Sequence, residues 1–88
     1  MTFKKHFVLT DLGDEIIAVP MDTGEDDFRG IVRLNETGAD IFRGIQAGLS
    51  EDEIAAQLVE MYDGLGPDRA RTDVRALAEK FREAGLLD

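Results

Sequence analysis

Few side chains in this sequence could perform chemistry, and none has the partners that catalysis requires. His6 is the only histidine, and it stands close to an N-terminus that we expect to be frayed. Ser50 and Thr37 could act as nucleophiles only beside a base, and no base lies near them in the sequence. Gly64-Leu65-Gly66 lacks the lysine that follows in a phosphate-binding loop. We therefore predict no catalytic residue and no cofactor, and a protein that is not an enzyme.

Two groups of carboxylates are better explained by solvation and helix capping than by metal binding. The stretch from Asp22 to Asp27 is acidic, but it lacks the calcium-loop spacing and the closing glutamate of an EF-hand. Glu51, Asp52 and Glu53 stand at an expected helix start, where carboxylates stabilise free backbone N–H groups. We predict no metal site.

The arginines are the residues best suited to binding. Arg71, Arg75 and Arg82 border the apolar stripe of a helix expected from Pro67 onward. Successive residues of an α-helix are rotated by about 100° around the helix axis. Measured in this way from Val74, the apolar side chains lie at angles between about −80° and +40°, and the three arginines lie between about 60° and 100°. Arginine can bind a carboxylate with two parallel hydrogen bonds. The same positions also fit a solvated face, with the stems over apolar surface and the charges in water, and both interpretations stay open.

Composition limits the classes of function. The 88 residues carry a net charge of −9, which would repel a phosphate backbone, and their number fits one domain with one modest core. Cysteine is absent, which excludes disulfides and thiolate metal sites. The longest apolar runs, Ile16 to Val19 and Gly85 to Leu87, are too short to cross a bilayer. We expect a single domain over residues 1–88, in the cytoplasm, that binds neither nucleic acid nor membrane.

The first third of the chain predicts three strands. Phe7 to Leu9 and Glu15 to Pro20 are apolar runs around a loop that contains Asp and Gly, which is typical of a hairpin. The stretch from Phe28 to Leu34 alternates between two faces. One face holds Phe28, Gly30, Val32 and Leu34, and the other holds Arg29, Ile31 and Arg33.

Three helices are predicted after the strands, each from its capping residues. Asn35 suits the N-cap of a helix over Glu36 to Ala47, which Gly48 would end. Ser50 and Glu53 form a capping box for a helix that we expect to end near Gly64. Pro67 fits the first turn of the last helix. Its apolar stripe is formed by Val74, Leu77, Phe81 and Ala84, and we expect the first three to be core.

The order of elements predicts an α+β fold of the winged helix-turn-helix type. A three-stranded antiparallel sheet with one apolar face needs a cover, and three amphipathic helices can supply it. The first two helices are separated by only about three residues, as in a helix-turn-helix.

A series of residues from Gly30 to the C-terminus resembles a known family. In order they are Gly30-Ile31-Val32-Arg33-Leu34-Asn35-Glu36-Thr37-Gly38-Ala39, Ile41, Gly48-Leu49-Ser50, Glu53-Ile54, Leu58, Tyr62-Asp63, Asp73-Val74, Leu77 and Gly85-Leu86-Leu87. This order and spacing is similar to the PqqD-like family, whose members are also called RiPP recognition elements. The acidic stretch from Asp22 to Asp27 departs from founding-type PqqD proteins.

The resemblance implies a peptide-binding domain that catalyses nothing. Such domains bind the leader segment of a ribosomally synthesised precursor peptide, which adds as a strand to the sheet edge beside the last helix. They act as peptide chaperones in natural product biosynthesis, alone or fused to a modifying enzyme such as a radical SAM protein. By the same resemblance, the receiving strand here would be Phe28 to Leu34.

Combining this implication with the arginines gives a hypothesis for the site. We predict a cleft for an extended peptide with acidic and apolar residues. The strand would contribute Arg29, Gly30, Ile31, Val32, Arg33 and Leu34, and the last helix would contribute Arg71, Arg75, Ala78 and Arg82. Ile31 and Ala78 would form the apolar floor.

Two other functions stay open. A winged-helix domain could be a DNA-binding regulator, but the helix from Glu51 to Tyr62 begins with acidic residues and contains no lysine or arginine. The chain could also be an adaptor that binds a protein and no leader peptide. An unpaired sheet edge could, in addition, join two copies into a homodimer.

Overall fold

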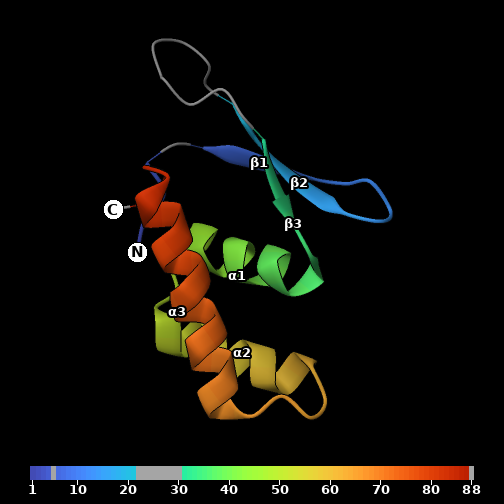
Figure 1. The fold of residues 1–88 in the computed structure, drawn as a ribbon, viewed down its shortest axis with the longest axis vertical. Helices are drawn as coiled ribbons and strands as arrows, with labels where there is room; N and C mark the ends of the chain where they lie inside the picture. The colour runs from blue at the N-terminus through green and yellow to red at the C-terminus, as the bar shows by residue number, and fades with distance from the viewer. Residues whose placement is uncertain (5, 22–30, 88) are drawn as a thin grey trace.

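The computed structural model describes residues 1–4, 6–21 and 31–87, and it confirms the predicted α+β order of a three-stranded sheet followed by three helices. In Figure 1 the sheet lies at one end, α1 lies beside it and α2 lies at the far end, while α3 runs along both helices. The two termini lie close together. Within the described residues, no helix is both long enough and apolar enough to cross a membrane.

The sheet is antiparallel, in the order β1-β2-β3. β1 (Phe7–Asp11) and β2 (Ile16–Pro20) form the predicted hairpin. In its turn, the Asp11 carboxylate accepts a hydrogen bond from the Gly13 backbone N–H, and Gly13 has a positive φ of 93° that favours glycine. The hairpin prediction is therefore confirmed, together with the chemistry of its turn.

Among the described residues, β3 comprises Val32–Leu34 of the strand predicted from Phe28. Ile31 is described but lies outside β3, and residues 28–30 lie outside the described part of the chain. The predicted alternation holds where it can be seen, because Leu34 is buried while Ile31 and Arg33 are exposed. β3 pairs with β2 through Ala18↔Val32, Ile17↔Arg33 and Ile16↔Leu34, so it forms one edge of the sheet.

The three helices begin at the residues that capping predicted. α1 (Glu36–Gln46) has Asn35 as its N-cap, whose side chain accepts a hydrogen bond from the Gly38 N–H at 2.7 Å. α2 (Glu51–Met61) begins with both bonds of the Ser50–Glu53 capping box. α3 (Pro67–Glu83) has its proline in the first turn. α1 ends at Gln46, one residue before the predicted Ala47, and α2 ends at Met61, three residues before the predicted Gly64.

The core is centred on aromatic rings from four parts of the chain. Phe42 of α1 stacks on Phe3 with ring centroids 4.3 Å apart, and Phe7 and Phe81 approach Phe42 edge-on at 5.5 and 5.6 Å. Phe3 forms an antiparallel bridge with Leu87, and the Lys4 N–H donates to the Leu86 carbonyl. The expectation of a frayed N-terminus is therefore wrong, because its first residues pair with the C-terminus and contribute a ring to the core.

α3 buries a slightly different stripe from the predicted one. Its buried residues are Ala70, Val74, Ala78 and Phe81. Leu77 is only half-buried, and Ala78 is completely inaccessible. Ala78 therefore belongs to the core and cannot form the floor of a cleft open to a peptide.

A close contact between α1 and α2 gives a first prediction. A Cβ added at Gly44 would lie 2.7 Å from Ile54 Cγ1, and Ile54 is only 1% exposed. Alanine normally favours a helix over glycine by about 1 kcal/mol. Gly44→Ala should nevertheless destabilise the protein by about 1–3 kcal/mol, because the buried Ile54 cannot move away without strain. Urea denaturation followed by circular dichroism measures the change.

Gly66→Ala is the matched control, since a Cβ at Gly66 would meet nothing within 4 Å. We expect it to change stability by less than about 1 kcal/mol. A Gly44→Ala protein as stable as the wild type would contradict the close packing of the two helices.

Candidate functional site

The two edges of the sheet differ in how well they are covered. At the β1 edge, the Gln46 side chain of α1 donates a hydrogen bond of 3.0 Å to the Phe7 carbonyl. The outer edge of β3 has no strand partner among the residues that the structure describes. Unpaired backbone N–H and C=O groups are a template for another strand, so in the described part of the chain β3 is the candidate edge for strand addition.

A groove of about 550 Å³ runs between the end of β3, the start of α1 and one flank of α3. We call it the β3–α3 groove. Its lining residues are Arg33, Leu34, Asn35, Thr37, Gly38, Ile41, Arg69, Asp73, Ala76, Leu77 and Lys80. Leu34 and Ile41 are buried at its base and Leu77 is half-buried in its wall, so it offers apolar surface beside the open strand edge.

The charged residues of the β3–α3 groove are mainly basic. Arg33, Arg69 and Lys80 contribute three positive charges, and Asp73 contributes one negative charge. Arg69 Nε lies 3.1 Å from Asp73 Oδ1, and Arg33 Nε lies 3.9 Å from a carboxylate oxygen of Glu15. The chain as a whole has a net charge of −9, so the charge of this groove is opposite in sign to that of the whole protein. A groove with this charge favours an acidic ligand.

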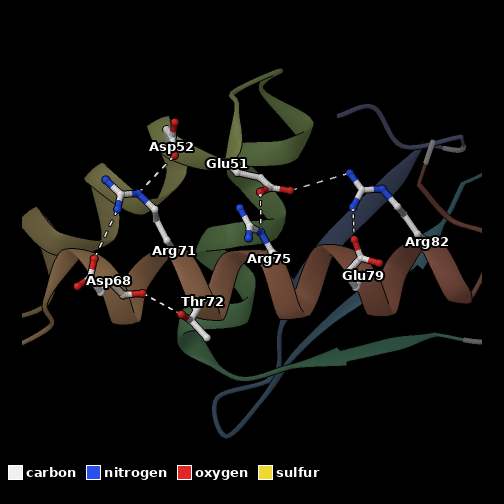
Figure 2. Close-up of polar contacts among 8 residues, drawn as sticks. All are labelled: Glu51, Asp52, Asp68, Arg71, Thr72, Arg75, Glu79 and Arg82. Atoms are coloured by element: carbon white, nitrogen blue, oxygen red, sulfur yellow. Dashed lines mark hydrogen bonds and ion pairs between the residues drawn. The ribbon is translucent and has the colours of Figure 1, made fainter.

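The arginines singled out in the sequence lie on the opposite flank of α3. Figure 2 shows the side chains of Arg71, Arg75 and Arg82 on the side of α3 that faces the start of α2, while the strand leading into α1 passes along the other side. Their ion pairs are Arg71 with Asp52 and Asp68, Arg75 with Glu51, and Arg82 with Glu51 and Glu79. The structure therefore does not bring these arginines to β3, and their contact with a peptide stays a prediction.

The predicted strand residues are placed as follows. Arg33 and Leu34 line the β3–α3 groove, and Val32 is half-buried on the inner face. Ile31 is 48% exposed, directly before β3. Arg29 and Gly30 lie outside the described residues.

Sequence reasoning missed the helical residues of the groove. On the same scale of angles around the helix axis from Val74, these residues lie between about −60° and −160°, on the other border of the apolar stripe. They are Leu77, Asp73, Lys80, Arg69 and Ala76. The sequence does contain this second border of charged residues. It does not show which of the two borders faces the sheet.

Away from the groove, a hydrogen bond joins α1 to the end of α2. The Tyr62 hydroxyl donates to Asp40 Oδ2 at 2.5 Å. This bond to Asp40, together with burial, raises the pKa of Tyr62 above its usual 10.0. Ionisation of Tyr62 breaks the bond and sets two negative charges side by side.

This contact predicts a pH dependence. Because the folded pKa is raised, the stabilisation from neutral Tyr62 is complete below pH 10.0 and is lost as the pH rises through the folded pKa. Tyr62 is the only tyrosine and tryptophan is absent, so phenolate absorbance follows this one group. We expect its midpoint above that of free tyrosine, and a lower midpoint in Asp40→Asn. Equal midpoints in the two proteins would contradict the assigned cause.

No group of side chains within residues 1–4, 6–21 and 31–87 is arranged to hold a metal ion. The β3–α3 groove contains hydroxyl, amide, carboxylate and basic groups beside apolar ones. Such a lining can bind an extended polypeptide through main-chain bonds, apolar contacts and charge.

Comparisons with known proteins found similarity at the level of sequence family and of fold. The sequence model of a family described as Coenzyme PQQ synthesis protein D (PqqD) matches residues 8–87. A solved structure, TbiB1 in complex with the TbiA(beta) leader peptide, is similar in fold with a TM-score of 0.76 and 19% sequence identity. The similarity covers 100% of this chain and 95% of TbiB1. No curated protein matches the chain in sequence.

Proposed function

This chain belongs to the PqqD family, and from that premise we propose that it binds the leader segment of a ribosomally synthesised precursor peptide. The leader adds as a strand to the open edge of β3 and lies in the β3–α3 groove. Val32 to Leu34 supply the main-chain bonds. The wall from Arg69 to Lys80 contacts the side chains of the leader.

One observation carries this proposal: the sheet edge that has no strand partner among the described residues borders the groove. Strand addition needs free main-chain groups for affinity and adjacent pockets for specificity, and both occur together at β3. The fold shared with TbiB1, which was solved with a leader peptide, supports the same use of this architecture.

We also propose that the chemistry is performed by a partner enzyme. In this proposal the chain is a non-catalytic chaperone that presents the leader to a modifying enzyme, such as a radical SAM protein. The side chains of the groove bind the leader and do not react with it. Because ribosomes release precursor peptides in the cytoplasm, we propose that the protein acts there.

NMR titration of the isotopically labelled protein tests the proposal. The probes are synthetic leader segments of precursor peptides encoded beside its gene, with duplex DNA as the control. We expect one leader to give saturable shifts at Ile31 to Leu34 and along Arg69 to Lys80, and DNA to give none. The signals of Arg71, Arg75 and Arg82 show in the same experiment whether the other flank of α3 takes part.

The alternatives predict different results. A DNA-binding regulator would show shifts in Glu51–Met61 on addition of DNA, although this helix contains no lysine or arginine and Glu51 pairs with α3. A homodimer formed through β3 would show broadened signals at Val32–Leu34 before any peptide is added. If no leader perturbs the groove, the leader-binding proposal is overturned.

A further inference from the structure

The two flanks of α3 differ in how their positive charges are neutralised. On the flank that faces α2, Arg71, Arg75 and Arg82 each pair with at least one carboxylate, as Figure 2 shows. On the groove flank, Asp73 pairs with Arg69, but Lys80 has no ion-pair partner in the part of the chain that the structure describes. The cations beside α2 are therefore compensated internally, whereas the groove contains a lysine without an ion-pair partner among the described residues.

Arg33 adds a second weakly compensated cation at the strand. Its contact with Glu15 is 3.9 Å long, and the two side chains are 73% and 43% exposed. An ion pair of that length in water holds the guanidinium only loosely. Arg33 and Lys80 line the same groove from opposite sides, one from β3 and one from α3.

We infer that the β3–α3 groove selects a leader segment with a carboxylate beside apolar side chains, and that Lys80 and Arg33 bind this carboxylate. The inference rests on the proposed function and names the class of peptide that it serves. Main-chain bonds to β3 have little sequence preference, so the side chains of the groove must supply discrimination. Leu34 and Leu77 accept apolar groups, while a lysine or arginine of the peptide would meet two like charges.

Because the protein as a whole is acidic, the preference for a carboxylate is limited to the groove. A net charge of −9 repels an acidic peptide at long range, but at physiological salt such repulsion is screened beyond about 8 Å. Only an acidic residue that enters the groove gains from Lys80 and Arg33. We therefore expect affinity to depend on one or two defined acidic positions and not on the total charge of the leader.

A double-mutant cycle tests the inference. The probe is the synthetic leader segment that binds most tightly in the titration, with each Asp or Glu replaced singly by Asn or Gln. Calorimetry measures its affinity for the wild type, Lys80→Gln, Arg33→Gln and Lys4→Gln. The Lys4→Gln variant is the matched control, because it makes the same change of side chain and of charge at an exposed position that does not line the β3–α3 groove.

We expect one acidic position of the leader at which neutralisation weakens binding to the wild-type protein about tenfold. The same neutralised leader should bind Lys80→Gln at most about twofold more weakly than the unmodified leader does. Lys80→Gln should itself weaken binding of the unmodified leader by about threefold to tenfold, and Lys4→Gln by less than about twofold. Circular dichroism checks that each variant is folded.

The failure of this inference is distinct from the failure of the proposed function. If a leader binds at β3 but every neutralised version binds equally well, the selection of a carboxylate is overturned while leader binding stands. Equal losses in Lys80→Gln and Lys4→Gln would also overturn it, because the effect would then follow net charge. If no leader binds, both proposals are overturned.

Discussion

Phe42→Ala is expected to destabilise the protein by about 3–5 kcal/mol, the largest effect of any single truncation that we consider. Phe42 is completely buried in the middle of α1, and its ring meets those of Phe3, Phe7 and Phe81. Removing it leaves a cavity beneath the sheet and removes contacts with three other parts of the chain. A domain of this size has a total stability of about 4–13 kcal/mol, so a large fraction is lost.

Urea denaturation measures this effect, and near-UV circular dichroism reports the packing of the remaining rings. Leu12→Ala is the matched control: Leu12 is 56% exposed, and its truncation should change stability by less than about 0.5 kcal/mol. A loss below about 1.5 kcal/mol in Phe42→Ala would contradict the central position of this ring.

The elements that the sequence predicted best are those set by local chemistry. Asn35 and the Ser50–Glu53 pair satisfy backbone N–H groups within three residues of themselves, so the starts of α1 and α2 can be inferred without knowing the fold. The Asp11–Gly13 turn is equally local. Interactions of this kind have partners fixed by sequence spacing, and the structure confirms them.

The candidate site depends on long-range contacts that spacing does not fix. α3 has a charged border on each side of its apolar stripe, and the sequence prediction selected the border with Arg71, Arg75 and Arg82. Those arginines reach Glu51 and Asp52, which precede them by 19 to 31 residues, and no local rule connects these positions. The groove lies on the other border, with Leu77 and Lys80.

Small residues added to the difficulty. Ala70 and Ala78 are completely buried in α3, but alanine has little apolar surface and so gives a weak signal in the sequence. Leu77 looked like a core residue because it is large, and it is instead half-buried in the wall of the groove. Phe3 was missed for another reason: Leu87, with which it forms a β-bridge, lies at the opposite end of the chain.

The position of Leu77 gives the second large expected effect. Leu77→Glu should weaken leader binding by about 30-fold or more, because it removes apolar surface from the groove wall and places a negative charge where we expect a carboxylate of the peptide. Leu77 is only half-buried, so the fold should survive with a loss of about 1–2 kcal/mol. Calorimetry with the leader that binds the wild type measures the affinity, and urea denaturation measures the stability.

Thr72→Glu is the control for this prediction, since it makes the same change in net charge at an exposed position of the same helix that does not line the β3–α3 groove. We expect its affinity to stay within about twofold of the wild type. If Leu77→Glu is folded and binds the leader as tightly as Thr72→Glu does, the wall of α3 does not contact the peptide, and the leader must bind elsewhere on the sheet. A selective loss in Leu77→Glu would instead assign the groove flank of α3 to recognition, because the two substitutions make the same change in net charge and only Leu77→Glu alters the groove wall.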